Sequence, residues 1–401
     1  MIIKRPKYIE AITPFIGQPL VKILSGVRRC GKSTIFDMLK EELLSSGIDK
    51  KCIITKTYTD MDIAQNITAK QMYDELVCVT KDNVYSYLIL DEIQEISGWE
   101  KVVNSLLEKG NCDIYVTGSN SKLMSSEIST YLTGRYVQIP VYTLSFSEYL
   151  QFKSESKLTK RELLNEYIRF GGFPVVALNE YESNMAYQIV NGIYYTVVSR
   201  DIVNRHRIHK QELFDRVVRY VVENTGKTFS ANSISKFLKS ENRQLSNESI
   251  YNYLRWLEQA FIIYPCRRYD LQGKNILKTQ EKYYLADVSL KYALFGYNRN
   301  MLDAVMENIV YLELKRRGYD VYVGKLGTKG IDFVAILRDE KIYVQVCVQL
   351  PENSDRETEN LKDIPDNYPK YVVTLNDLDV GNDEGIKIVH LQDFLLTDRW
   401  I

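Results

Sequence analysis

The sequence predicts an α/β protein in which a parallel sheet comes first, a helical region follows, and a second, smaller α/β part ends the chain. Between residues 20 and 150, extended runs at 20–25, 52–58, 87–90 and 113–117 alternate with helical patterns such as 99–108. This alternation is typical of a parallel sheet with helices on both faces. After residue 318, extended runs return at 321–324, 331–337, 341–348 and 371–375.

The composition fits two or three ordinary globular domains in 401 residues, with 45% hydrophobic and 26% charged side chains. The charges of the 52 basic and 52 acidic side chains cancel. The net charge therefore does not favour nucleic acid or a membrane surface as a partner. The six cysteines form no C-x-x-C pair, which argues against a zinc site or a disulfide framework. The first residues lack the apolar core of a signal peptide, and we expect a cytoplasmic protein without a membrane partner.

The first motif follows the run at 20–25. Residues 26–33 read GVRRCGKS and match G-x-x-x-x-G-K-[ST] at every fixed position. Glycines let the backbone N–H groups curl around a phosphate, and a helix beginning at Lys32 adds its positive end. Lys32 would bind the β and γ oxygens and Ser33 would bind Mg²⁺. A chance glycine-rich turn is the alternative, but the strand before it and the helix after it favour ATP and Mg²⁺. The predicted nucleotide-binding residues are Gly26, Arg28, Arg29, Cys30, Gly31, Lys32, Ser33 and Thr34.

The second motif is an apolar strand that ends in two acids, at residues 87–92 (YLILDE). A buried parallel strand would deliver Asp91 at its carboxyl end, where it could hold Mg²⁺. Glu92 could then act as general base toward the attacking water. The alternative is an ordinary strand followed by a charged loop. It is disfavoured because both motifs occur in the required order.

Two further sets of polar residues lie downstream. Thr117, Ser119 and Asn120 follow the strand at 113–117, and each could contact the γ-phosphate or the water; Thr117 could equally be a plain β-former. Arg135 could neutralise the transferring phosphoryl group, in cis or from a neighbouring subunit, or be a solvated loop arginine. One of Arg28 and Arg29 could meet phosphate, while the other pairs with an acid.

Residues 148–220 are mostly helical, interrupted by GGFP at 171–174. Residues 227–282 read as helix, turn, helix and β-ribbon, with Ser230 and Ser246 as N-caps of helices 231–239 and 247–259. This order is that of a winged helix-turn-helix.

Charge makes this region a candidate for contact with duplex DNA. Between Thr225 and Lys282 there are ten basic and five acidic residues. Basic side chains here could meet phosphates, and Asn247, Ser249 and Asn252 could lie near base edges. A packing or protein-contact role is the alternative. The candidate phosphate contacts include Lys236, Arg243, Arg267 and Arg268, with Lys239, Arg255 and Lys274 beside them.

The motifs in their order resemble the AAA-family ATPases of bacteria and archaea that carry an extra C-terminal domain of unknown function. The resemblance rests on SGVRRCGKST at 25–34, LILDEIQEI at 88–96, TGSNS at 117–121, LTGR at 132–135, LSFSE at 144–148, GGFP at 171–174 and KYYLAD at 282–287, with Asp201, Ile202 and Arg205. It spans nearly the whole chain and implies an ATPase-type nucleotide site on a RecA/AAA-like core. It says little about the biological role.

The last part resembles the PD-(D/E)xK nuclease fold, also called restriction-endonuclease-like. Glu307 falls on the expected helix and Asp332 on the expected strand, but Gln345 stands where an acid belongs and Cys347 where the lysine belongs. Such a nuclease needs two acids and a lysine to hold Mg²⁺ and activate water. We therefore expect a degenerate domain that does not cleave nucleic acid. The twelve acidic and five basic residues after position 350 also disfavour a nucleic-acid groove there.

The predicted domains are a P-loop AAA-like ATPase domain at 1–150, a helical connector at 151–222, a winged-helix-like domain at 223–282 and a nuclease-like α/β domain at 283–401. The predicted function is Mg²⁺-dependent ATP hydrolysis that drives movement of the later domains. The alternatives are a nucleotide-gated DNA-binding regulator, a DNA-processing protein associated with defence or mobile elements, and, more distantly, a kinase. A protein partner and homo-oligomer formation are further expectations.

Overall fold

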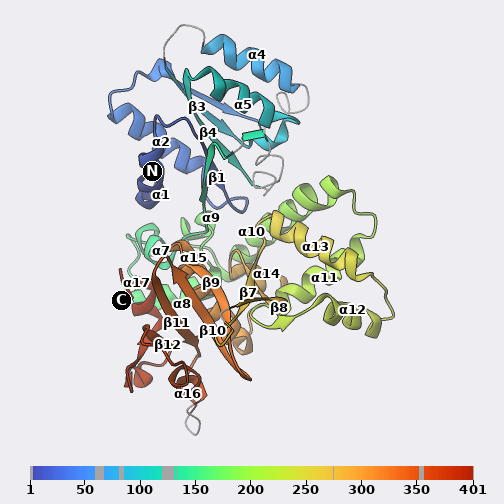
Figure 1. The fold of residues 1–401 in the computed structure, drawn as a ribbon, viewed down its shortest axis with the longest axis vertical. Coiled ribbons are helices and arrows are strands. Elements are labelled where there is room, and N and C mark those ends of the chain that lie inside the picture. Colours follow the sequence, from blue (N-terminus) through green and yellow to red (C-terminus); the bar gives the residue numbers. More distant parts are fainter. Residues whose placement is uncertain are drawn as a thin grey trace. The chain divides into compact units, whose positions relative to one another are not determined.

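The computed structural model describes residues 3–58, 67–80, 85–119, 131–132, 134–273, 275–351 and 356–400. Contacts divide the chain into two compact units (Figure 1), one of Met1–Tyr142 with Gln259–Phe261, and one of Thr143–Glu258 with Ile262–Ile401. Both units combine helices and sheet, so the chain is α/β as predicted. Within the described residues, no helix has the length and apolar character needed to cross a bilayer.

Unit 1 is built on a five-stranded sheet in the order β2-β3-β4-β1-β5. Every neighbouring pair is parallel, so the carboxyl ends of all five strands meet at one edge. The strands are β1 (Val21–Ser25), β2 (Ile53–Thr57), β3 (Ser86–Asp91), β4 (Cys112–Gly118) and β5 (Tyr136–Pro140). β1 and β4 are buried along their full length, as expected for central strands covered on both faces.

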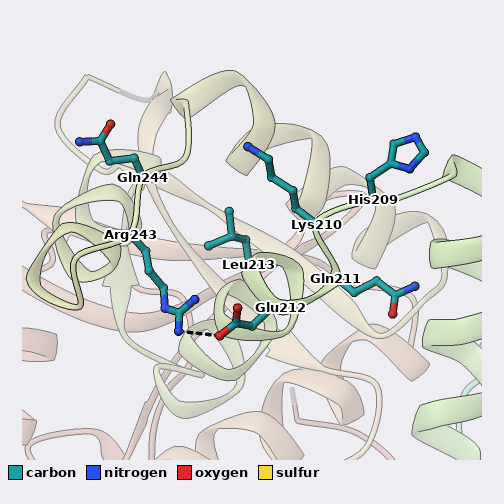
Figure 2. Close-up of a pocket in the computed structure, with 7 residues that line it drawn as sticks. All are labelled: His209, Lys210, Gln211, Glu212, Leu213, Arg243 and Gln244. Carbon is teal, nitrogen blue, oxygen red and sulfur yellow. Dashed lines mark ion pairs between the residues drawn. The ribbon is translucent and has the colours of Figure 1, made fainter.

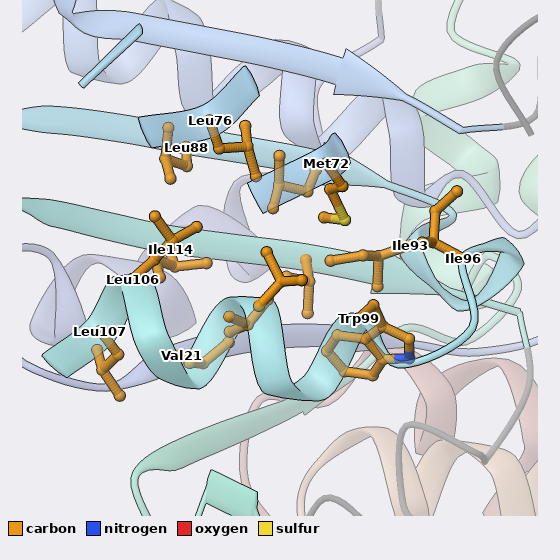
Figure 3. Close-up of a cluster of buried hydrophobic side chains, with 14 of the residues drawn as sticks. Val21, Met72, Leu76, Leu88, Ile93, Ile96, Trp99, Leu106, Leu107 and Ile114 are labelled. Atoms are coloured by element: carbon orange, nitrogen blue, oxygen red, sulfur yellow. The ribbon is translucent and has the colours of Figure 1, made fainter. Parts of the chain in front are cut away.

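Helices cover the two faces of this sheet (Figure 1). On one face, α4 (Ala69–Val79) and α5 (Trp99–Lys109) contribute Met72, Leu76, Trp99 and Leu106 to a core shared with strand residues such as Leu88 (Figure 3). On the other face lie α1 (Pro6–Ile12) and α2 (Lys32–Ser45). The short helices are η1 (Thr13–Phe15), η2 (Lys50–Cys52) and η3 (Ile93–Glu95).

Unit 2 begins with helices and ends around a large sheet. Its helices before the sheet are α7 (Phe146–Phe152), α8 (Lys160–Phe170), α9 (Pro174–Ala177), α10 (Ser183–Thr196), the π-helix η5 (Val197–Asn204), α11 (Gln211–Glu223), α12 (Ala231–Ser240) and α13 (Asn247–Gln259). Ser230 and Ser246 accept hydrogen bonds from the backbone N–H groups three residues on, which confirms them as the N-caps of α12 and α13. Further helices are α14 (Ser289–Phe295), η6 (Arg299–Met301), α15 (Leu302–Arg316), α16 (Arg356–Lys362), η7 (Asp377–Asp379) and α17 (Leu391–Leu396).

The sheet of unit 2 has nine strands in the order β13-β14-β12-β11-β10-β9-β7-β8-β6. They are β6 (Thr228–Phe229), β7 (Ile263–Asp270), β8 (Asn275–Leu285), β9 (Asp320–Leu326), β10 (Lys329–Leu337), β11 (Glu340–Val346), β12 (Lys370–Thr374), β13 (Gly381–Asp383) and β14 (Ile386–His390). The long helix α15 packs against β8, β9, β10 and β11.

This sheet differs from the domain plan expected from the sequence. The β7–β8 ribbon, expected to be the wing of a separate module at 223–282, pairs through β7 with β9 of the C-terminal part, where Arg268 lies opposite Val323 and Asp270 opposite Lys325. Backbone hydrogen bonds therefore join the two expected domains in one sheet. Contacts also group residues 143–222 with this sheet and not as a separate connector.

The GGFP segment forms a tight backbone joint within unit 2. The N–H of Gly172 donates to the Asp287 carboxylate over 2.8 Å, and its carbonyl accepts from the N–H of Leu144 over 2.7 Å. A Cβ on Gly171 would collide with the Asp287 carboxylate, and one on Gly172 with the Leu144 carbonyl. Three motifs that are remote in sequence, LSFSE, GGFP and KYYLAD, thus meet at one structural joint.

Candidate nucleotide site

The carboxyl edge of the unit 1 sheet brings the predicted site residues together. β1 ends at Ser25 and leads into the P-loop, β3 ends at Asp91, and β4 ends at Gly118. β4 lies between β3 and β1 in the sheet. The polar end of β4 therefore stands between the two acids and the phosphate loop.

The P-loop begins in close contact with the residue that follows β5. A Cβ on Gly26 would collide with the carbonyl oxygen of Val141, so only glycine lets the loop pass this point. Gly31 adopts φ 101°, a left-handed conformation that glycine tolerates, immediately before α2 begins at Lys32. The Lys32 ammonium is buried and donates to the carbonyls of Gly26 (2.9 Å) and Val27 (3.2 Å). The loop is thus curled around its own lysine.

Asp91 is held from two sides by hydroxyl groups. Ser33 donates to one carboxylate oxygen over 2.7 Å, and Thr117 donates to the other. The Thr117 hydroxyl also accepts the backbone N–H of Glu92 over 2.9 Å. The P-loop hydroxyl and the strand carboxylate predicted as metal ligands are therefore direct neighbours.

Glu92 follows in a left-handed backbone conformation, with φ 53° and ψ 44°, at the start of η3. Its carboxylate accepts from the Gln94 amide (2.5 Å) and from the Ser119 hydroxyl (3.1 Å). Burial alone would raise the pKa of Glu92, but the charges of Lys32 and Arg28 and these two hydrogen bonds outweigh it, so the pKa is lowered. The carboxylate is therefore ionised near neutral pH and able to accept a proton.

These residues fit a nucleotide with a hard divalent cation. The N-terminus of the 14-residue helix α2, the curled loop and the buried Lys32 match the requirements of a triphosphate. Ser33 and Asp91 supply adjacent oxygen ligands of the kind that Mg²⁺ prefers. When bound, Mg²⁺ would neutralise charge on the phosphate oxygens. The protein's own groups would orient the phosphates, through Lys32, and receive the proton of water, through Glu92.

The remaining P-loop residues differ in environment. Arg28 is half-buried and its charge acts on Glu92, whereas Arg29 is exposed in a left-handed conformation with φ 69°. Burial raises the pKa of Cys30, whose side chain lies inside the loop. Thr34 is half-buried at the start of α2. Among the predicted sensors, Asn120 lies outside the described residues.

Arg135 does not reach the phosphate loop within its own chain. It precedes β5, beside Val21, at the amino edge of the sheet, so a five-residue strand of about 16 Å separates it from the P-loop edge. Its guanidinium donates to Asn104 over 2.6 Å and pairs with Glu108 at 3.4 Å. The role in cis is therefore wrong, because the parallel register fixes Arg135 at the opposite edge. A role from a neighbouring subunit stays a prediction.

Two residues of this site were not among the predicted ones. Arg5, buried before α1, donates to the carbonyl of Cys30 in the P-loop over 2.9 Å and to that of Tyr142 over 3.1 Å. Gln94 contacts Glu92, as described above. Gln94 lies inside the LDEIQ run, so its position beside the two acids was visible in the sequence, whereas no local pattern links Arg5 to a loop 25 residues later.

In unit 2, the two acids of the nuclease-like pattern meet a lysine from an unexpected strand. The Lys282 ammonium, from β8, donates to Glu307 of α15 over 2.5 Å and to Asp332 of β10 over 3.2 Å. Gln345 accepts the N–H of Asp332 over 3.1 Å and donates to Glu357 over 2.7 Å. Cys347 lies in an apolar cluster, where burial raises its pKa to about 12. The lysine missing from position 347 is thus supplied by β8, but it is already bound by both acids.

The candidate DNA contacts are partly engaged with acids. Arg243 lies beside a cavity of about 550 Å³ lined by residues 209–213, 243 and 244, where it pairs with Glu212 at 2.5 Å (Figure 2). Arg267 lies 3.8 Å from Glu281. Lys236 and Lys239 are exposed on α12. Lys274 lies outside the described residues. These pairs reduce the positive charge available to a phosphate backbone.

Two family models match separate parts of the chain. A family model described as an AAA domain matches residues 18–150, and one described as a domain of unknown function matches residues 161–300. An uncharacterised protein of Haemophilus influenzae is 37% identical over 98% of this chain and 99% of its own length. An uncharacterised protein of Methanocaldococcus jannaschii is 32% identical over 93% of this chain and 85% of its own.

Among solved structures, the Walker-type ATPase of Pyrococcus abyssi is similar to this chain with a TM-score of 0.51 and 13% identity. The match covers 74% of this chain and 96% of that one. At this level of identity the likeness concerns the fold. The fold of this chain is therefore similar to that of the Pyrococcus abyssi protein.

Proposed function

Because the chain belongs to the AAA-domain P-loop ATPases that carry a C-terminal domain of unknown function, we propose that it binds ATP with Mg²⁺ and hydrolyses it. The observation that carries the proposal is the contact of Ser33 with Asp91 at 2.7 Å beside an ionised Glu92. Metal ligand and base are adjacent to the phosphate loop, as hydrolysis requires. Lys32 would bind the phosphates, Ser33 and Asp91 the metal, and Glu92 the proton of water.

The test is the substitution Glu92→Gln, which keeps size and hydrogen bonding but removes the base. We expect at least a 100-fold loss of ATP hydrolysis with ATP binding retained, measured by phosphate release and by titration of a fluorescent ATP analogue. Glu42→Gln, an exposed glutamate on α2, is the matched control and should keep wild-type turnover. Undiminished hydrolysis by Glu92→Gln would overturn the assignment of the base.

We further propose that the nucleotide cycle changes the conformation of residues after 143. Hydrogen exchange of the Glu92→Gln variant with ATP, compared with ADP, tests this. Protection changes confined to unit 1 would contradict it, whereas changes within α7 to α10 or the unit 2 sheet would support it.

DNA contact is the second candidate function, favoured by the exposed Lys236 and Lys239 on α12. Salt-dependent binding of duplex DNA that depends on nucleotide and is weakened by replacing both lysines with alanine would support it. The paired Arg267 and Arg243 should matter less, because each already has a carboxylate partner. Absence of binding at low salt would end this candidate.

A further inference from the structure

Gln94 has a chemical feature that its packing alone does not explain. It is only 8% exposed, and its amide nitrogen donates to Glu92 over 2.5 Å. Its amide oxygen is fully enclosed, yet it has no hydrogen-bond partner among the residues that the structure describes. A buried acceptor without a donor is unfavourable in a folded protein. Such an atom beside a candidate general base points to a ligand with a hydrogen to donate.

The orientation of the amide follows from its neighbour. An amide could be turned so that nitrogen and oxygen exchange places. That exchange would set the amide oxygen against the Glu92 carboxylate, and two acceptors cannot share a hydrogen bond. The nitrogen therefore faces Glu92, and the oxygen of the same planar group lies close to that carboxylate without a hydrogen-bond partner among the described residues.

The surroundings hold Glu92 and Gln94 in place. Glu92 and Gln94 flank Ile93 in the tight turn that begins η3, where the backbone N–H of Glu92 donates to Thr117 and the carboxylate also accepts from Ser119. Ile93 itself is completely buried in the core of unit 1. The turn thus fixes two hydrogen-bond acceptors, the Glu92 carboxylate and the Gln94 oxygen, near the end of β3.

We propose that Gln94 positions the attacking water of the ATPase reaction, with its nitrogen fixing the Glu92 carboxylate and its oxygen accepting one hydrogen of the water. This inference rests on the proposed function. In the step concerned, the water oxygen forms a bond to the γ-phosphorus while the bond from that phosphorus to the ADP oxygen breaks. Glu92 takes one proton of the water, and ADP and inorganic phosphate leave. A glutamine that orients water is an established device in phosphoryl transfer.

The test is Gln94→Leu, which keeps the side-chain size but removes both polar atoms. We expect kcat to fall by about 100-fold, with the KM for ATP changed less than threefold, because Gln94 would not contact the nucleotide. A purely structural role would lower the yield of folded protein or raise KM, and would not lower kcat alone.

Gln94→Glu provides a second variant that retains the shape if the leucine variant does not fold. It keeps an acceptor but places a second carboxylate against Glu92, so we expect slow turnover with a KM for ATP near that of the wild type. A wild-type kcat in either variant would overturn the inference. If the wild-type protein hydrolyses no ATP, or Glu92→Gln retains full turnover, it is the proposed function that fails.

Discussion

At the scale of single residues, one hydroxyl group connects the two acids at the end of β3. Thr117 donates to Asp91 and accepts from the N–H of Glu92. The first contact orients the carboxylate that would hold the metal, and the second fixes the backbone from which the candidate base extends. Groups that orient metal ligands and bases influence reactions that they do not touch. We therefore propose that Thr117 orients both acids, in addition to being a β-former.

Replacing Thr117 by valine should separate the effect of side-chain shape on the reaction from that of the hydrogen bonds of the hydroxyl group. The two side chains have similar size, but valine leaves Asp91 and the N–H of Glu92 without the hydroxyl. We expect a fall in ATP hydrolysis of about 10- to 100-fold and a higher Mg²⁺ requirement, measured by phosphate release over a Mg²⁺ titration. Thr117→Ser keeps the hydroxyl and should retain most of the activity. Equal rates for valine and threonine would refute the role.

Residues of the site differ in how well the sequence predicts them. Lys32, Ser33 and Asp91 follow from local motifs, because the backbone of a loop or strand end dictates the residue type. Arg5 and Lys282 could not be predicted, because each acts through contacts with segments 25 or more residues away. For Arg135 the sequence left a role in cis, a role from a neighbouring subunit and a solvated loop arginine open, because a motif order does not reveal at which edge of a sheet a residue lies.

At the scale of elements, the sequence located most helices and strands but not the partners of the β-ribbon. Capping serines and hydrophobic periodicity predicted helices 231–239 and 247–259 to within one residue. The pairing of β7 with β9 depends on a register between distant segments, about which local patterns carry no information. Strands of the two expected domains therefore lie in one sheet.

The joint around GGFP leads to a prediction on stability. Gly171→Ala would force a Cβ against the Asp287 carboxylate at a position with φ 71°, and we expect a loss of about 3 kcal/mol or more in the free energy of unfolding. Gly192→Ala is the matched control, since it lies exposed within α10 with nothing near its Cβ position. Alanine there should be neutral or stabilise by about 0.5–1 kcal/mol. Urea unfolding followed by circular dichroism distinguishes the two.

The triad of Lys282, Glu307 and Asp332 predicts a pH dependence. Burial and the nearby Asp332 raise the pKa of Glu307 to about 7, against the opposing attraction of Lys282. Between the unfolded value of 4.5 and about 7, the folded state keeps a proton that the unfolded state releases. The contribution of Glu307 to stability therefore falls as pH rises through this range, by up to about 3 kcal/mol, and is constant above it.

The substitution Glu307→Gln should remove this fall of stability with rising pH. The free energy of unfolding of the wild type, measured in urea from pH 4.5 to 8, should decrease relative to that of the variant until about pH 7. If the free energies of unfolding of the two proteins changed in parallel with pH, the Lys282 ammonium would keep Glu307 ionised over the whole range. That result would contradict the predicted titration.

At the scale of the whole molecule, each of the two compact units contains a hydrophobic core, and the residues of the proposed nucleotide site lie in unit 1. A ligand that binds the folded state stabilises by about 2.7 kcal/mol at a concentration 100 times its Kd. In the non-hydrolysing Glu92→Gln variant, ATP with Mg²⁺ should raise the melting temperature of the unit 1 transition, measured by calorimetry. An unchanged melting temperature at ATP concentrations far above the Kd would refute ATP binding by folded unit 1.

The sheet of unit 2 has a mechanical consequence. Hydrogen-bonded neighbours connect the strands from β6 to β13, and α12 and α13 are inserted in the chain between β6 and β7. This helical pair is therefore anchored at both ends in the same sheet, through β6 beside β8 and through β7 between β8 and β9. A force on α12 or α13 should reach these strands directly, because short connections join the two helices to β6 and β7.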